Sequence, residues 1–458
     1  MDCRFPHRLR LLIISLSYFA ISYLSTGFLA ASSLGVSSYR NGLDAYQIFI
    51  DWMIIPYSTS ILFYCYSILA TKNRLDLRIL LAKLSWATFI ASAFFLIFPA
   101  QFSQPLPLIE NKVFAVFYSL LHTVDNPYNQ APSLHVIFCV IFYREIPKLI
   151  KKPIILFASR CWLMLIILST WFTFQHHSID ILSGLIIGVC INYFINKPQH
   201  YIGSIYLMMS GLMILVANFI TANSVEKIPL LIIAISYYLA LSFALVSIVY
   251  LKNKPELLGK SQSRFNMLTW LLYGPYLLIY RLLWLLNNYH LQRHSPPSKI
   301  ITQVTERLWV GPRLSEYDLS RLFNQQKETL LTDIRFIDLS AEVAEVDGIN
   351  ESHYQLFSML DLQAPCFNKL RLAVQTVQAA LENNETVYLH CAMGYSRSFL
   401  VACIYLIAYK NQSVNNAKNY LLSLNDAIKL PQSYISDDDL IAISKDCTIK
   451  NFRKAPNE

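Results

Sequence analysis

The sequence has no pair of cysteines spaced as Cys-x-x-Cys, although it contains nine cysteines. Zinc sites and disulfide frameworks both need clustered or paired cysteines, so neither kind of site is predicted. Charged residues are also scarce, at 15% of the 458 residues, while 55% are hydrophobic. This balance excludes an ordinary soluble enzyme and predicts that most of the chain lies in a membrane. No metal ion and no cofactor are expected.

Long apolar runs dominate the first 250 residues, and each is near the length that spans the hydrocarbon core of a bilayer. They cover residues 11–31, 46–70, 79–99, 132–144, 154–173, 179–195, 204–222 and 228–250. Residues 1–250 are therefore expected to form a polytopic α-helical membrane domain of about eight spans. Residues 251–299 are expected to hold an interfacial or re-entrant helix and a linker, because Gly274-Pro275 and Arg281 interrupt the apolar run at 266–288. A ninth span is the alternative there.

Charge divides the chain at the same place. Residues 1–300 carry a net charge of +13, and residues 301–458 carry −4. The cations of the apolar half gather at alternate ends of successive runs, and the positive-inside rule places those ends in the cytoplasm. They are Arg4, Arg8, Arg10, Lys72, Arg74, Arg78, Arg144, Lys148, Lys151 and Lys152. No compact basic domain is present, so a nucleic-acid partner is not expected.

The most informative motif is His-Cys-Ala-Met-Gly-Tyr-Ser-Arg-Ser at residues 390–398. It lies between a buried strand expected at 386–389 and an apolar helix expected at 399–409. Backbone amides that converge at a helix N-terminus bind anions, and they favour a thiolate at Cys391. Arg397 offers a planar fork for two phosphoryl oxygens, and Ser398 can donate a hydrogen bond to the sulfur. The expected phosphate-binding loop consists of Ala392, Met393, Gly394, Tyr395, Ser396 and Arg397.

This motif, after a strand and before a helix, resembles the signature of the dual-specificity phosphatase family. The resemblance covers residues 300–445 and implies an α/β domain with a central, mostly parallel sheet flanked by helices, before a polar tail at 446–458. The family hydrolyses phosphomonoesters through a phosphocysteine intermediate. It takes a proton from an aspartate roughly 30 residues before the cysteine, and Asp361 occupies that place. His390 is expected to fix the loop through hydrogen bonds to the backbone.

Two polar clusters interrupt the apolar half, at helix ends expected to face away from the cytoplasm. Ser133 and His135 open one short helix, and His176 and Asp180 open another. Ionisable residues are costly within a bilayer and mark functional sites there. At a spacing of i and i+4, His176 and Asp180 are expected to share a helix face, so that the carboxylate orients the imidazole.

Pro-Ser-x-His followed by His-x-x-x-Asp resembles the type 2 phosphatidic acid phosphatase superfamily, over residues 40–200. By this resemblance His176 is the nucleophile, Asp180 its partner and His135 the acid, while Ser133 holds phosphate. The lysine and Arg-Pro motif of the superfamily is absent, and Thr170 stands where an arginine is expected. These departures favour the branch that resembles inositol phosphorylceramide and sphingomyelin synthases, which move a phosphoalcohol between lipids.

Together these patterns resemble bacterial inner-membrane phosphatases of a two-domain type, with the phosphatase domain in the cytoplasm. The expected activity is hydrolysis of phosphomonoesters, on lipid phosphates, with a second histidine-based phosphoryl or phosphoalcohol transfer site in the membrane domain. The alternative is a protein tyrosine, serine or threonine phosphatase that is tethered by a catalytically silent membrane anchor. The expected partners are thus the membrane and a phospholipid or phosphoprotein substrate.

Overall fold

The computed structural model describes residues 3–448 except 32–37, 125–126, 224–229, 295–300, 317, 319–333, 347–348, 350 and 431–434. The linker expected around Ser295–Ser298 lies outside the described residues, and so does the polar tail expected at 446–458, apart from residues 446–448, which end the last helix. The chain divides into two compact units, Met1–Ser247 and Ile248–Glu458. Each unit is described separately below.

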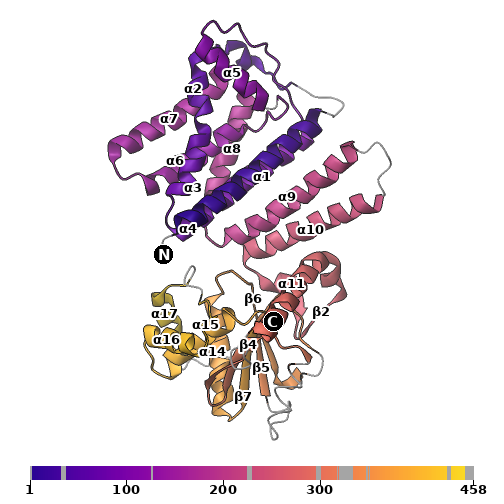
Figure 1. Cartoon of the computed structure of the whole chain (residues 1–458), viewed down its shortest axis with the longest axis vertical. Helices are drawn as coiled ribbons and strands as arrows, with labels where there is room; N and C mark the ends of the chain where they lie inside the picture. Colours follow the sequence, from indigo (N-terminus) through magenta and orange to yellow (C-terminus); the bar gives the residue numbers. More distant parts are fainter. Residues whose placement is uncertain are drawn as a thin grey trace. The chain divides into compact units, whose positions relative to one another are not determined.

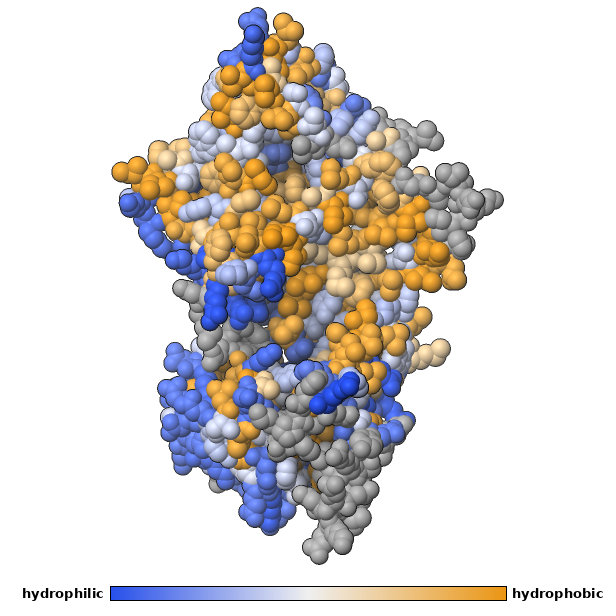
Figure 2. All heavy atoms as spheres, viewed as in Figure 1, coloured by the Kyte–Doolittle hydropathy of each residue, from blue (hydrophilic) through white to orange (hydrophobic). Residues whose placement is uncertain are grey.

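The first unit is helical (Figure 1). Its α-helices are α1 (Phe5–Ala31), α2 (Ile54–Ser58), α3 (Ser60–Ala70), α4 (Arg74–Ile97), α5 (Lys112–Val124), α6 (Leu134–Leu149), α7 (Pro153–Phe172), α8 (Ser178–Phe194), α9 (His200–Asn223) and α10 (Leu230–Lys252), and η1 (Gly42–Tyr46) and η2 (Asp51–Met53) are 3-10 helices. The last turn of α10 already belongs to the second unit. Figure 2 shows apolar side chains over much of the visible face of these helices.

Seven helices of the described residues are long and apolar enough to cross a membrane. They are Phe5–Ala31, Asp51–Ala70, Arg74–Ile97, Pro153–Phe172, His200–Ala222, Leu231–Lys252 and Met267–Leu291. Six correspond to runs expected from the sequence, and the seventh falls in the segment expected to be interfacial. The runs at 132–144 and 179–195 correspond to the shorter helices α6 and α8, of 16 and 17 residues. Membrane crossing itself stays a prediction.

Helices α6 and α8 approach each other closely because glycines face α6. A Cβ atom added at Gly184 would lie 2.9 Å from the Ser133 carbonyl oxygen, and one added at Gly188 would lie 2.8 Å from Val140 Cβ. Small residues let helix backbones come together in this way. The N-terminal ends of α6 and α8, which carry the two polar clusters, are thereby brought side by side.

The second unit contains a five-stranded mixed sheet in the order β3-β4-β7-β5-β6. The strands are β3 (Thr302–Thr305), β4 (Leu308–Pro312), β5 (Ile334–Ser340), β6 (Tyr354–Met359) and β7 (Thr386–Cys391). Strands β4, β7, β5 and β6 are parallel neighbours, whereas β3 pairs with β4 in antiparallel fashion. The α/β architecture with a mostly parallel sheet is confirmed for this part of the chain.

Helices pack on the sheet through an apolar core, because inward residues of β4, β5 and β7 alternate along each strand. The packed helices are α14 (Phe367–Glu382), α15 (Arg397–Tyr409), α16 (Val414–Leu424) and α17 (Asp437–Thr448). The opposite face carries a smaller apolar cluster around Phe336 and Tyr388. Figure 1 shows α14 to α17 gathered beside the sheet.

The segment before residue 300 is built into this unit. It contains η3 (Pro255–Leu258), the two-residue strands β1 (Lys260–Ser261) and β2 (Arg264–Phe265), and the long helix α11 (Met267–His294). The Lys260 ammonium forms a buried ion pair with Asp338 of β5, and the Glu345 amide donates to the Ser263 carbonyl at 2.7 Å. The sheet and its N-terminal flank therefore form a single packed body.

Candidate functional site

The nucleophile candidate lies at the end of an inner strand. Strand β7 is paired on both sides and ends at Cys391, and α15 begins six residues later at Arg397. The loop between them is thus held at the carboxyl edge of the sheet and at a helix N-terminus, as predicted. The Cys391 side chain is buried, and its sulfur lies 3.5 Å from the Ser398 hydroxyl. Ser398 occupies the position expected for a hydrogen-bond donor to the sulfur.

Gly394 explains how the loop can close so tightly. Its φ is +73°, in the left-handed region that favours glycine. A Cβ atom there would lie 2.4 Å from the Pro312 backbone nitrogen. No other residue fits without moving the end of β4, so the loop backbone depends on this glycine. Of its neighbours, Ala392 is buried, whereas Met393, Tyr395 and Ser396 are partly exposed.

Arg397 is oriented by fixed partners. Its Nη1 donates to Glu342 Oε2 at 2.7 Å and to the Met359 carbonyl at 2.6 Å, and its Nη2 donates to the Tyr280 hydroxyl at 3.3 Å. Burial by itself would lower the pKa of Arg397, but the carboxylates of Glu342 and Asp361 raise that pKa well above its ordinary value. The guanidinium is therefore a permanent cation. Within the described residues its Nε has no partner, which leaves a donor for a phosphoryl oxygen.

Asp361 lies beside this arginine, as a general acid should. Its Oδ1 is 3.6 Å from Arg397 Nη2, its Oδ2 accepts a hydrogen bond from the Tyr280 hydroxyl at 3.0 Å, and its amide donates to Glu342 Oε1 at 2.6 Å. The carboxylate is 27% exposed, so it can meet a substrate from solvent. Glu342 thus holds both Arg397 and the backbone of Asp361.

Sequence reasoning missed Glu342 and Tyr280. A usable signal existed for Glu342, because it follows the carboxyl end of β5 and therefore lies at the same edge of the sheet as Cys391. No local signal existed for Tyr280, which is separated from Arg397 by 117 residues and lies in a segment that reads as lipid-facing.

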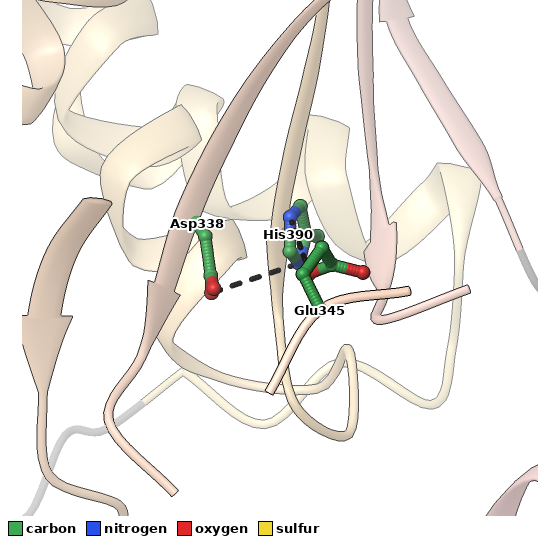
Figure 3. A group of neighbouring side chains, drawn as sticks. All are labelled: Asp338, Glu345 and His390. Atoms are coloured by element: carbon green, nitrogen blue, oxygen red, sulfur yellow. Dashed lines mark ion pairs between the residues drawn. The ribbon is translucent and has the colours of Figure 1, made fainter. Parts of the chain in front are cut away.

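His390 differs from the expectation. Its ring nitrogens make no hydrogen bond to the backbone among the described residues; instead they face Asp338 at 3.8 Å and Glu345 at 3.5 Å (Figure 3). The register of the sheet explains this difference, because it pairs Asp338 of β5 with His390 of β7 and so places the two side chains next to each other. The histidine braces the strand beneath the loop through buried carboxylates, not through loop carbonyls.

Asp338, Glu345 and His390 offer three potential metal-ligand atoms that all lie within 4.8 Å of one another. The ammonium of Lys260, however, contacts Asp338 and donates to the Ser340 carbonyl at 2.9 Å. The chain itself supplies the compensating cation, so we assign this cluster a structural role. Burial would raise the pKa of Asp338, but Lys260 and His390 hold that pKa below its ordinary value.

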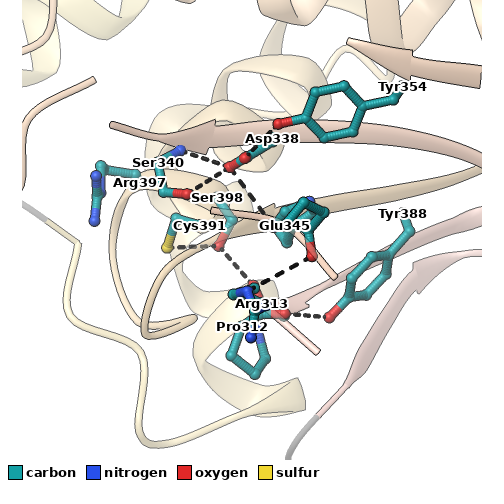
Figure 4. A network of polar contacts seen from close by, with 12 residues as sticks. Pro312, Arg313, Asp338, Ser340, Glu345, Tyr354, Tyr388, Cys391, Arg397 and Ser398 are labelled. Atoms are coloured by element: carbon teal, nitrogen blue, oxygen red, sulfur yellow. Dashed lines mark hydrogen bonds and ion pairs between the residues drawn. The ribbon is translucent and has the colours of Figure 1, made fainter. Parts of the chain in front are cut away.

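Figure 4 shows how this cluster reaches toward the reactive loop. The Tyr354 hydroxyl donates to Asp338 Oδ2 at 2.7 Å, and the Ser340 amide donates to Asp338 Oδ1 at 2.7 Å. The Cys391 and Ser398 pair lies at the other end of the same network. The polar groups behind the loop are thus tied to one another, which fixes the position of the sulfur.

In the first unit, the structure brings the two polar clusters together. His176 Nδ1 is 3.4 Å from Asp180 Oδ2, and the His135 and His176 rings lie 6.3 Å apart, measured between centroids. The expectation that His176 and Asp180 share a helix face is wrong, because α8 begins at Ser178. His176 instead approaches the carboxylate from the preceding turn.

Ser133 is also at this place, at the N-cap of α6. Its amide donates to the Asp180 carbonyl at 3.0 Å, and its buried hydroxyl has no partner among the described residues. The ring of Tyr57 stacks on His135 with centroids 4.2 Å apart. The four residues predicted for the membrane site therefore converge, with Tyr57 as a wall that the sequence did not indicate.

Asp44 is a further residue of this polar cluster that the sequence did not indicate. It is buried, accepts a hydrogen bond from the Ser178 amide at 2.8 Å, and lies 3.5 Å from His177 Nδ1. A carboxylate at the start of a long apolar run was a signal that could have identified it. Thr170, at the position where an arginine is expected, directs its hydroxyl to the Ile167 carbonyl at 2.7 Å.

Comparison with known proteins finds a family match within the second unit. Residues 319–437 match the family model of the dual specificity phosphatase catalytic domain. No curated protein matches the chain. The chain is similar to the solved structure of PTPMT1 in complex with PI(5)P, at 18% identity and a TM-score of 0.28, over 32% of this chain and 97% of that one.

Two further solved structures are each similar to 33% of the chain. One is a leucine rich repeat and phosphatase domain containing protein from Entamoeba histolytica, at 13% identity and a TM-score of 0.25, over 33% of this chain and 94% of that one. The other is human DUSP28, at 16% identity and a TM-score of 0.27, over 33% of this chain and 96% of that one. From the family match, this chain carries a dual specificity phosphatase catalytic domain at residues 319–437, within its second unit.

Proposed function

We propose that the protein is a membrane-bound phosphatase that removes phosphate from lipid phosphomonoesters at Cys391. The reaction depends on one observation, that Cys391 and Arg397 lie close enough to interact electrostatically and that Asp361 Oδ1 is 3.6 Å from Arg397 Nη2. A nucleophile, a clamp for the phosphoryl group and a proton donor are the three parts that such a reaction needs.

The reaction has two steps. In the first, the Cys391 thiolate attacks phosphorus, the bond from phosphorus to the ester oxygen breaks, and Asp361 gives its proton to the departing alcohol. In the second, water attacks the phosphocysteine, Asp361 takes a proton from that water, and the sulfur leaves as thiolate. Ser398, 3.5 Å from the sulfur, stabilises the developing negative charge of the leaving thiolate. Arg397 binds the phosphoryl oxygens throughout.

The preference for a lipid rests on how the acid loop is held. Gln363 Nε2 donates to the Tyr250 carbonyl at 2.7 Å, and Asn253 Nδ2 donates to the Ala364 carbonyl at 2.9 Å. Tyr250 lies in the last turn of the candidate span Leu231–Lys252, so the loop of Asp361 is tied to the end of a helix that is apolar enough to cross a membrane. This arrangement favours a substrate whose phosphate emerges from the bilayer surface.

The test is a substrate panel on the full-length protein in nanodiscs. Lipid phosphomonoesters, a soluble aryl phosphate and phosphotyrosine peptides are compared for wild type and for Cys391→Ser. We expect the lipid phosphomonoesters to give the highest kcat/KM, and Cys391→Ser to abolish all phosphate release. A clear preference for the peptides would support the alternative of a tethered protein phosphatase, and phosphate release by Cys391→Ser would exclude the thiolate mechanism.

A second activity is favoured by the geometry of the first unit. We infer that His176 attacks a phospholipid phosphorus through Nε2, since Nδ1 faces Asp180, while His135 protonates the departing oxygen and Ser133 binds phosphate. The hydroxyl of an acceptor lipid then attacks this phosphorus, gives its proton to His135 and displaces His176. The departures at Thr170 and the missing lysine motif favour a phosphodiester, which carries less charge, and hence transfer of a phosphoalcohol. The chain is then bifunctional.

His176→Ala in a Cys391→Ser background tests this second site, with radiolabelled phospholipid and headgroup exchange as the measurement. We expect exchange in Cys391→Ser and none in the double variant. His200→Ala is the matched control, because His200 starts α9 and takes no part in the cluster. Equal exchange with and without His176 would mean that the first unit is only an anchor.

A further inference from the structure

Helix α11 presents two unlike faces. Leucines spaced by three, four and seven residues follow one side, and each is at least 49% exposed. These outward leucines are Leu268, Leu271, Leu278, Leu282, Leu285 and Leu286. A stripe of this length is larger than the isolated apolar residues that soluble surfaces carry, so it marks an interaction surface. An apolar patch is visible on this part of the second unit in Figure 2.

The other face of α11 is bound to the catalytic apparatus. Tyr280 contacts Asp361 and Arg397, and the Tyr395 hydroxyl in the phosphate loop donates to Asn287 Oδ1 at 2.9 Å. The Trp284 ring lies under the Arg313 guanidinium at 4.5 Å. A helix that crossed the bilayer would carry these polar partners into hydrocarbon, where unsolvated polar groups are costly. Although α11 has the length and hydropathy of a span, its inner contacts exclude that placement.

The position of α11 along the chain favours lipid as the occupant of its outward face. Tyr250, at the end of the candidate span Leu231–Lys252, has its hydroxyl 3.2 Å from that of Tyr276 in α11, and both residues belong to the second unit. The end of a membrane helix thus adjoins α11. The helix also carries exposed cations, Arg281 and Arg293, that suit anionic headgroups.

We propose that the outward leucines of α11 dock on the surface of a lipid bilayer, with the helix axis in the membrane plane. The inner face of the same helix then forms a wall of the phosphatase site, so that the loop of Cys391 faces phosphates at the membrane surface. This deepens the proposed function and rests on it for the chemistry, but the docking itself is independent of catalysis. It resolves the ambiguity of residues 266–288 in favour of an interfacial helix.

Depth-dependent quenching tests the docking in the full-length protein. Leu282 is replaced by a genetically encoded fluorescent amino acid, and the protein is placed in nanodiscs with lipids brominated either near the headgroup end or near the bilayer centre. We expect strong quenching by the shallow bromines and weaker quenching by the deep ones. Leu372 of α14, which is 47% exposed, is the matched control position and should not be quenched.

Two results of this measurement would overturn the docking. If the probe at position 282 behaves like the one at 372, the outward face does not meet lipid and is covered by protein or by water. If deep bromines quench it best, the helix spans the bilayer. Neither result depends on Cys391, so the docking can fail while Cys391-dependent phosphate release, and with it the proposed function, survives.

Kinetics give a second readout. The variant Leu282→Glu/Leu286→Glu should lose about tenfold in kcat/KM on a lipid phosphomonoester in vesicles, because charge on the apolar face opposes insertion. Its rate on a soluble aryl phosphate should match that of wild type, which also shows that the site is folded. Leu372→Glu should change neither rate. An undiminished rate of the double variant on vesicles, or an equal loss in Leu372→Glu, would contradict the docking.

Discussion

The Glu342 carboxylate holds the Arg397 guanidinium from behind, with 2.7 Å between Oε2 and Nη1 and with both side chains buried. The same carboxylate accepts the amide hydrogen of Asp361 at 2.6 Å. One buried acid therefore sets the distance between Arg397, the proposed phosphate clamp, and Asp361, the proposed proton donor.

Glu342→Ala should destabilise the second unit and nearly abolish phosphate release, because it removes the closer of the two carboxylates that face the buried Arg397. Removing one partner of a buried ion pair costs about 3 to 5 kcal/mol. Thermal unfolding and kcat/KM on an aryl phosphate measure the two effects. Glu342→Gln, which keeps the hydrogen-bonding shape, should retain more stability than alanine; equal stability of the two variants would argue against the pairing.

Asp361→Asn should lower kcat by about 10² to 10⁴ on substrates with poor leaving groups, because an amide cannot give its proton to the departing alcohol. An aryl phosphate with an acidic phenol needs little protonation, so its hydrolysis should fall much less. A leaving-group series measures this difference. Asp438→Asn, at an exposed position in the first turn of α17, is the control. An equal loss of kcat for all leaving groups would show that Asp361 is not the general acid.

Gly394→Ala should destroy the phosphate-binding loop, since its φ of +73° and the 2.4 Å approach to Pro312 leave no room for a methyl group. We expect loss of phosphate release and of binding to an oxyanion such as vanadate, measured by calorimetry. The control is Gly42→Ala, because nothing lies within 4 Å of a Cβ atom there. Tight vanadate binding by Gly394→Ala would show that the loop has another conformation.

The Lys260 and Asp338 pair predicts acid sensitivity. The pKa of Asp338 is lowered in the folded protein from its ordinary 3.8, so the ionised carboxylate stabilises the fold above that pH. This stabilisation is lost as the pH falls below 3.8 toward the folded pKa. The rate of irreversible loss of phosphatase activity, followed at stepwise lower pH, should rise in this range. Asp338→Asn should be less stable at neutral pH and should show a flatter dependence.

The reactive loop was predictable because its parts are neighbours along the chain. The strand, the loop that holds Cys391, Gly394 and Arg397, and the helix all lie between residues 386 and 409. The sequence of this short segment is therefore enough to predict how the loop is held. Asp361 lies further away and was placed by family spacing, and the structure brings it beside Arg397.

The rest of the site comes from contacts between distant segments. Tyr280 reaches Arg397 across 117 residues and Lys260 reaches Asp338 across 78. Tyr280 belongs to the apolar run at 266–288, which indicates lipid contact alone, and Lys260 belongs to the polar segment before it, which carries no motif. In the first unit, the i and i+4 spacing of His176 and Asp180 correctly predicted that the two side chains are neighbours, but it wrongly predicted that both lie on one helix. The helix starts after His176, and a turn provides the approach.

The burial of Lys260 in the sheet has a consequence for how this chain can be divided. A fragment that starts after residue 300 would contain the matched family region, yet it would leave Asp338 enclosed with no ammonium beside it and would strip α11 from the catalytic arginine. A fragment that keeps these contacts must therefore begin upstream of Tyr250, whose carbonyl accepts a hydrogen bond from Gln363, and such a boundary lies close to the start of the second unit at Ile248.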